Sequence, residues 1–164
     1  MAVLPSVNQS VWTTPSDREI VSTRVFAAPR RLVFAAFTDP AHVPNWLLGP
    51  DGWTMPICEI DLRVGGAWRY VMVAGGGFEV AFHGEYREIV ENERIVTTEV
   101  FEAMPGDGVL NIVTFREEDG RTTLELLVEC GSREIRDVIL ESGMEAGMQE
   151  QMDLLEELVT GEPA

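Results

Sequence analysis

Alternation of apolar and polar positions dominates the middle of the chain and predicts a series of β-strands. Runs rich in β-branched and aromatic residues cover about residues 18–26, 54–63, 67–73, 79–90, 94–101, 110–117 and 122–130. The turns between the last six runs are short and carry Gly, Pro, Asn or Asp. Connections of this length join antiparallel neighbours, so we expect a seven-stranded antiparallel sheet built largely as a meander.

Helical periodicity is confined to three segments. Apolar residues at three- and four-residue spacing predict a short helix after Pro29, and a second short helix is expected over about residues 41–47. The last segment, 132–159, carries an apolar stripe with acidic residues on its other side. Ser132 is the expected N-cap. Gly143 and Gly147 lie on or beside the stripe, where glycine costs about 1 kcal/mol relative to alanine, so we expect a bend or a break there.

The order strand, two short helices, six strands and a long helix is typical of an α+β fold. A sheet with one apolar face needs a cover, and the amphipathic C-terminal helix can supply it. We therefore expect one domain over residues 17–161. Residues 1–16 mix polar residues and Pro without periodicity and are expected to form a flexible tail, with Trp12 as its one residue able to dock on the domain.

Charge narrows the range of partners. The net charge is −16, with 12 basic residues against 28 acidic ones. Nucleic acids and anionic membrane surfaces both require clustered basic residues, so neither is an expected partner. No apolar run reaches the roughly 18 residues of a membrane span. The first residues lack the pattern of a signal peptide, so a cytoplasmic location is expected.

Several segments form an ordered series along the chain: Phe26-x-Ala28-Pro29-x-x-Leu32-Val33-Phe34, Thr38-Asp39-Pro40 with Trp46, and the runs 61–72, 82–89, 93–96 and 143–147. This series resembles the SRPBCC superfamily of helix-grip (START-like, Bet v-like) domains. It is most similar to the branch of homologues of the heat-shock-protein-90 ATPase activator. The resemblance implies a curved sheet wrapped around a long C-terminal helix, with a cavity between them. Met148 departs from the family, which tends to place Trp there.

Residues that could line such a cavity follow from strand alternation. Trp68, Tyr70 and Met72 share one face of their strand, as do Phe82 and Tyr86 of the next. Aromatic and methionine side chains make an adaptable apolar wall, but a filled core without a ligand has the same pattern. The complete set of expected lining residues is Trp68, Tyr70, Met72, Phe82, Tyr86, Phe115, Met144, Gly147, Met148 and Met152.

The sequence offers no catalytic or metal-binding motif. His83 falls on the strand face opposite Phe82, and Cys58 and Cys130 lie in apolar strands where buried thiols are expected. The two histidines and two cysteines lack zinc-ligand spacing, and no Gly-x-Ser-x-Gly elbow occurs. Strand charges such as Arg69 and Glu99 are expected to pair across strands, but the sequence leaves open which way they face. No cofactor, metal or catalytic residue is assigned.

Three functions remain in competition. The first is noncatalytic binding of a small hydrophobic or amphipathic molecule in the cavity. The second is a protein-interaction module, with a chaperone partner as the name of the branch implies. The third is an enzyme of the cyclase or dehydratase type, which would need Tyr70, Tyr86 or an inward Glu or Arg in the cavity. Nothing in the sequence requires proton transfer, and a homodimer formed at sheet edges is left open.

Overall fold

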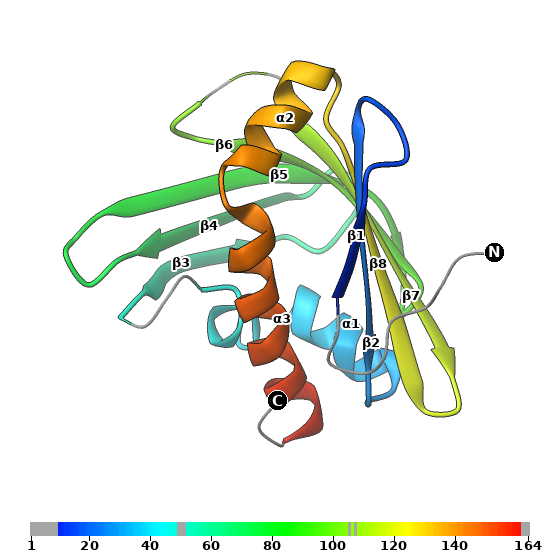
Figure 1. Cartoon of the computed structure of the whole chain (residues 1–164). Helices are drawn as coiled ribbons and strands as arrows, with labels where there is room; N and C mark the ends of the chain where they lie inside the picture. The colour runs from blue at the N-terminus through cyan, green and yellow to red at the C-terminus, as the bar shows by residue number, and fades with distance from the viewer. Residues whose placement is uncertain (1–9, 49–51, 105, 107, 162–164) are drawn as a thin grey trace.

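The computed structural model describes residues 10–48, 52–104, 106 and 108–161. One antiparallel sheet of eight strands curves around the C-terminal helix α3, Met144–Thr160 (Figure 1). The strand order across the sheet is β1-β2-β8-β7-β6-β5-β4-β3. The strands are β1 Ser10–Thr13, β2 Glu19–Phe26, β3 Thr54–Ile60, β4 Ala67–Val73, β5 Glu79–Val90, β6 Arg94–Phe101, β7 Val109–Glu118 and β8 Arg121–Glu129.

This arrangement confirms the predicted α+β class, with one correction to the strand count. The predicted seven strands all form, and β3 to β8 make the expected meander. The eighth is β1, which pairs with β2 within the segment predicted to be a flexible tail. Trp12 of β1 packs against a small cluster of Ile20, Val128 and Cys130. The packing of this partly buried side chain explains why so short and polar a segment is held as a strand. Residues 1–9 lie outside the described part.

Two α-helices and one 3-10 turn complete the fold. Helix α1, Arg30–Thr38, follows Pro29 as predicted, whereas the predicted second short helix is the 3-10 turn Val43–Asn45. The C-terminal segment is broken into α2, Arg133–Glu141, and α3. Gly143 has a φ of 83° at the break, a left-handed conformation that favours glycine. Ser132 caps α2, accepting a hydrogen bond from the backbone N–H of Ile135 at 3.2 Å.

Strand register divides the sheet into an inner face, toward α3, and an outer face. In β2, alternate residues are buried, and Phe26 among them belongs to the main core. Paired residues share a face, so the register carries this assignment across the whole sheet. The inner face includes Phe115 of β7, Thr97 of β6, Tyr86 of β5 and Trp68 of β4. Its core contacts come from α1 and the C-terminal half of α3.

Gly84 of β5 lies on the inner face where three strands approach closely. It pairs with Trp68 of β4. A Cβ atom at this position would lie 1.8 Å from the carbonyl oxygen of Thr98 and 2.7 Å from Nε1 of Trp68. Neither distance is tolerable, and the first involves backbone of the adjacent strand. Glycine is therefore required for β5 and β6 to pair in this register.

Replacement of Gly84 by alanine tests this constraint. We expect Gly84→Ala to lower the free energy of unfolding by about 3 kcal/mol or more, because overpacking against backbone cannot be relieved by a side-chain rotation. Gly76→Ala is the matched control, because an added Cβ there meets no atom within 4 Å. Urea unfolding of both variants measures the effect, and equal stability of the two would contradict the close approach.

Candidate functional site

The inner face of the sheet is closed at one end and partly open at the other. In the closed half, the side chains of Phe26, Phe115 and Leu155 are fully buried together with α1. In the other half, Tyr70 and Phe82 keep part of their surface accessible. The open half also contains Cys58, Thr97, Glu99, Asn111 and Met148, all partly accessible, and Phe101, which is 37% exposed.

Seven of the ten residues predicted to line a cavity lie in one contact cluster. Trp68, Tyr86, Phe115 and Met152 are buried in it, and Tyr70, Phe82 and Met148 pack against it. The rings of Trp68 and Tyr70 lie 4.7 Å apart, and those of Phe82 and Phe101 stack at 5.2 Å. Aromatic rings therefore form the floor of the open half.

The other three predicted lining residues lie elsewhere. Met72 is buried on the inner face but belongs to neither core cluster. Met144 packs against the small cluster beneath β1. Gly147 is exposed, and an added Cβ there would meet no atom within 4 Å. No strand approaches Gly147, so close packing does not explain the glycine.

Two tyrosine hydroxyls are joined by a hydrogen bond in the open half. Burial raises the pKa of Tyr70 well above its usual value, with further contributions from Tyr86 and Cys58. Burial also raises the pKa of Tyr86 to about 12. Both phenols consequently stay protonated and remain available as hydrogen-bonding groups.

Glu99 is the carboxyl group of this half. Alternation with Thr97 and Phe101, which pair with Tyr86 and Phe82, puts Glu99 on the inner face. Burial raises the pKa of Glu99, and a hydrogen bond with Asn111 of β7 partly offsets this effect. The residue nevertheless keeps part of its surface accessible. The carboxyl group of Glu99 could exchange a proton with a bound molecule. An inward polar group of this kind is what the cyclase or dehydratase hypothesis requires.

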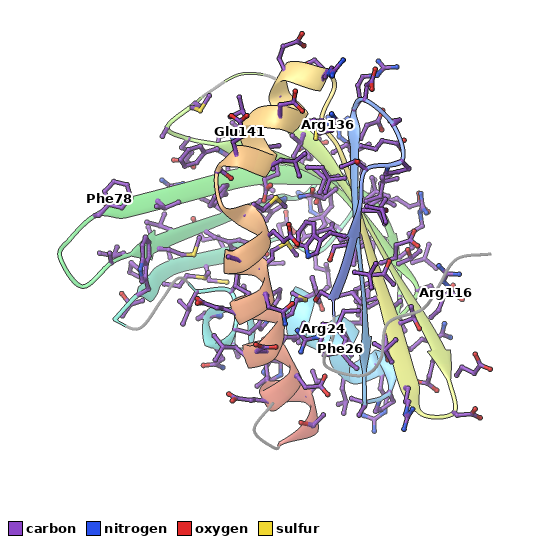
Figure 2. All side chains as sticks on the ribbon, in the orientation of Figure 1. Arg24, Phe26, Phe78, Arg116, Arg136 and Glu141 are labelled. Atoms are coloured by element: carbon purple, nitrogen blue, oxygen red, sulfur yellow. The ribbon has the colours of Figure 1, made fainter. Side chains whose placement is uncertain are left out.

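A buried arginine holds α3 to the sheet at the closed end. Arg24 is 1% exposed, and its Nη2 lies 2.9 Å from Oδ1 of Asp153, an ion-pair distance without hydrogen-bond geometry. Figure 2 shows Arg24 and Phe26 between α3 and β2, and the guanidinium lies 5.4 Å from the Phe26 ring centroid. Burial raises the pKa of Glu156, and Arg24 opposes this shift. This group anchors the helix and lies outside the open half.

His83 lies on the outer face, as alternation predicts. Its Nδ1 is 3.0 Å from Oε2 of Glu102, which also pairs with Arg69 through contacts of 2.9 and 3.0 Å. These hydrogen bonds, first that of Arg69 and then that of His83, lower the pKa of Glu102 to about 2. The trio is a surface charge cluster and contributes nothing to the inner face.

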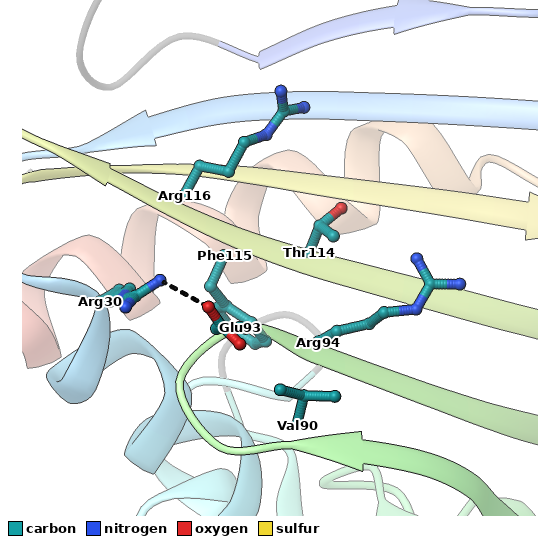
Figure 3. Close-up of a pocket in the computed structure, with 7 residues that line it drawn as sticks. All are labelled: Arg30, Val90, Glu93, Arg94, Thr114, Phe115 and Arg116. Carbon is teal, nitrogen blue, oxygen red and sulfur yellow. Dashed lines mark ion pairs between the residues drawn. The ribbon is translucent and has the colours of Figure 1, made fainter.

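Two surface depressions lie near the start of α1. One, of about 270 Å³, is lined by Val90 and Phe115 together with charged residues (Figure 3). Its three arginines are paired with acids: Arg30 with Glu93 at 3.7 Å, Arg94 with Glu88 at 3.3 Å and Arg116 with Glu125 at 3.3 Å. The second, of about 360 Å³, shares Arg30 and Arg116. Compensated charges on an open surface give little basis for specific binding.

The described residues bring together no group of three or more His, Cys, Asp or Glu side chains suited to a metal ion. No helix is long and apolar enough to span a membrane within the described residues, which are 10–48, 52–104, 106 and 108–161.

The sequence predicts Tyr70 and Tyr86 as lining residues but leaves the direction of Glu99 open and does not single out Asn111. The inward direction of Glu99 depends on the pairing of Thr97 with Tyr86. Asn111 lies opposite Thr97. The alternation of Glu99 with Phe101 along β6 is visible in the sequence and favours an inward Glu99. The neighbours of Glu99 on β5 and β7, by contrast, can be identified only from the strand register.

Comparison with known families gives a match over residues 27–160. The matching family is described as "Activator of Hsp90 ATPase homolog 1-like protein". Among curated proteins, none matches this chain.

Solved structures from several bacteria have the same fold. A protein from Rhodobacter sphaeroides superposes with a TM-score of 0.87 at 25% identity, covering 94% of this chain and 100% of its own. A protein from Chromobacterium violaceum is 31% identical with a TM-score of 0.76, covering 88% of this chain and 98% of its own. A protein from Mycobacterium smegmatis has a TM-score of 0.82 at 24% identity, with coverages of 93% and 99%.

Replacement of Glu99 by glutamine tests the burial of this carboxyl. Because burial raises its pKa, the folded chain holds this proton to higher pH than the unfolded chain. The stabilising contribution is complete below the unfolded pKa and is lost as pH rises through the folded pKa. We therefore expect the stability of Glu99→Gln relative to wild type, measured by urea unfolding, to increase as pH rises from the ordinary glutamate pKa of about 4.5 through the higher folded pKa. Glu129→Gln, at an exposed position of β8, is the control, and a pH-independent difference for Glu99→Gln would exclude the effect.

Proposed function

Because the chain belongs to the family of Activator of Hsp90 ATPase homolog 1-like proteins, we propose that it uses the inner face of this fold to bind a small amphipathic molecule. The ligand would lie between the open half of the sheet and α3, and binding would require no chemical step.

The observation that carries this proposal concerns Glu99. Burial raises the pKa of this residue, yet the residue keeps part of its surface accessible to water. Tyr70 combines the same two properties. Both properties fit a recess of the inner face that water can enter. The binding space that we propose lies between these residues and α3.

The walls of this space suit an amphipathic ligand. Phe82, Phe101 and the Trp68–Tyr70 pair supply aromatic surface, and Met148 of α3 supplies a flexible apolar side chain. Small-molecule sites are typically apolar with a few convergent polar groups. Here the polar groups are Glu99, Asn111 and the two tyrosine hydroxyls.

A larger side chain at position 148 tests the location of the site. Met148→Trp should fill the space beneath α3 and weaken binding of the neutral fluorescent probe N-phenylnaphthylamine by on the order of tenfold, about 1.4 kcal/mol. Glu150→Trp places the same side chain at an exposed position of the same helix and should leave binding unchanged. The measurement is a fluorescence titration, with circular dichroism to verify folding. Equal affinity of two folded variants would place any binding outside this space.

Helix α2 favours a second candidate function, a protein-interaction module. The helix has no buried residue and exposes Ile135 by 43%, Val138 by 51% and Leu140 by 38%. Exposed apolar side chains on one helix are a common feature of docking surfaces. The family description supports a chaperone ATPase of the Hsp90 class as the partner.

Charged substitutions on α2 test this second function. If α2 docks on the chaperone, the protein should raise the ATPase rate of an Hsp90-class chaperone, and the double variant Ile135→Glu, Val138→Glu should abolish that increase. The control is Glu134→Gln, Glu141→Gln on the polar part of the same helix. A rate that the wild-type protein leaves unchanged would contradict the candidate.

A further inference from the structure

We infer that the ligand presents an uncharged hydrogen-bond acceptor, a carbonyl or hydroxyl oxygen, to the indole N–H of Trp68. This inference rests on the proposed function and specifies the chemistry of its ligand.

Trp68 carries a buried donor without an acceptor. The residue is 5% exposed, and its Nε1 has no hydrogen-bond partner among the described residues. An indole N–H can only donate, and buried donors in proteins are nearly always paired. Trp46 shows the usual arrangement in the same molecule, because its Nε1 donates to the carbonyl oxygen of Ala36 at 2.8 Å. The unpaired N–H of Trp68 therefore indicates a place for an acceptor that the protein does not supply.

This N–H lies beside Gly84, on the neighbouring strand β5. Nε1 of Trp68 lies 2.7 Å from the position a Cβ of Gly84 would occupy, so the indole nitrogen sits over the glycine. The Thr98 carbonyl reaches the same glycine from β6 but does not accept this N–H. On β6, Glu99 lies between Thr97 and Phe101, which pair with the β5 residues on either side of Gly84. The indole donor and the carboxyl of Glu99 thus flank one position of the sheet.

The charges around this position favour an uncharged ligand. A carboxylate ligand would approach Glu99, and the buried cation of the inner face, Arg24, belongs to the closed half and already faces Asp153 and Glu156. An ammonium ligand has no acceptor for the Trp68 N–H. The chain's net charge of −16 also opposes entry of anions. A neutral oxygen acceptor on an apolar body satisfies all these constraints.

Three probes with the same ten-carbon chain separate these possibilities: 2-decanone, decanoate and decylammonium. Each is titrated into ¹⁵N-labelled full-length protein while the indole N–H signals are followed by NMR. Loss of one signal in Trp68→Phe, or NOEs to Gly84 in the wild type, identifies the Trp68 resonance. We expect 2-decanone to move this resonance downfield in a saturable way and to bind more tightly than either ion. Trp68→Phe should weaken 2-decanone binding by about 2- to 12-fold, the range of one neutral hydrogen bond.

The control is Trp12→Phe, a matched change in the small cluster beneath β1, which should leave binding of 2-decanone unchanged. The inference is overturned if 2-decanone binds without moving the Trp68 resonance, or if decanoate or decylammonium binds as tightly. Either result leaves the proposed function standing. Saturation by none of the three probes would contradict the proposed function itself, and the inference with it.

Discussion

The structure depends on the burial of one side of α3 against the inner face of the sheet. An antiparallel sheet with an apolar face is stable only when something covers that face. Met152, Leu155 and Val159 do this in the C-terminal half of α3, each side chain contributing about 1.5–3 kcal/mol if fully buried. The N-terminal half, which contains Gly147 and Met148, buries far less surface. One helix thus buries half of the concave face and leaves residues of the other half partly accessible.

The charged contacts at the closed end fix where this helix lies. Arg24 is buried on β2, whereas the side chain of its counterion Asp153 on α3 is half exposed, so sliding the helix would leave a buried arginine unpaired. A buried charge without a counterion is costly, which favours the observed position of the helix. The position of Met148 over the aromatic floor follows from this anchor, because Met148 precedes Asp153 by about 1.4 helical turns.

The strands and helices could be predicted from the sequence because their periodicities are local properties. The two-residue alternation located β2 to β8 within three residues, and of the two glycines expected to bend or break the last helix, Gly143 lies at the break and Gly147 within α3. Strand β1 was missed because four residues in a polar segment carry too little pattern, and its stability comes from the docking of Trp12. The resemblance to helix-grip domains was confirmed by the family match and the related structures. The shared face of the aromatic residues was predictable because strand alternation is also a local property. The inward direction of Glu99 depends on the strand register. The unpaired N–H of Trp68 depends on three-dimensional contacts.

Intermolecular NOEs between bound 2-decanone and the protein test the central claim most directly. The account predicts NOEs from the ligand methyl groups to Phe82 and Met148, because the proposed space is bounded by Phe82 of the sheet and Met148 of α3. NOEs confined to exposed apolar residues such as Val138 of α2 or Phe78 of the β4–β5 hairpin would contradict it, because the inner face would then be a filled core.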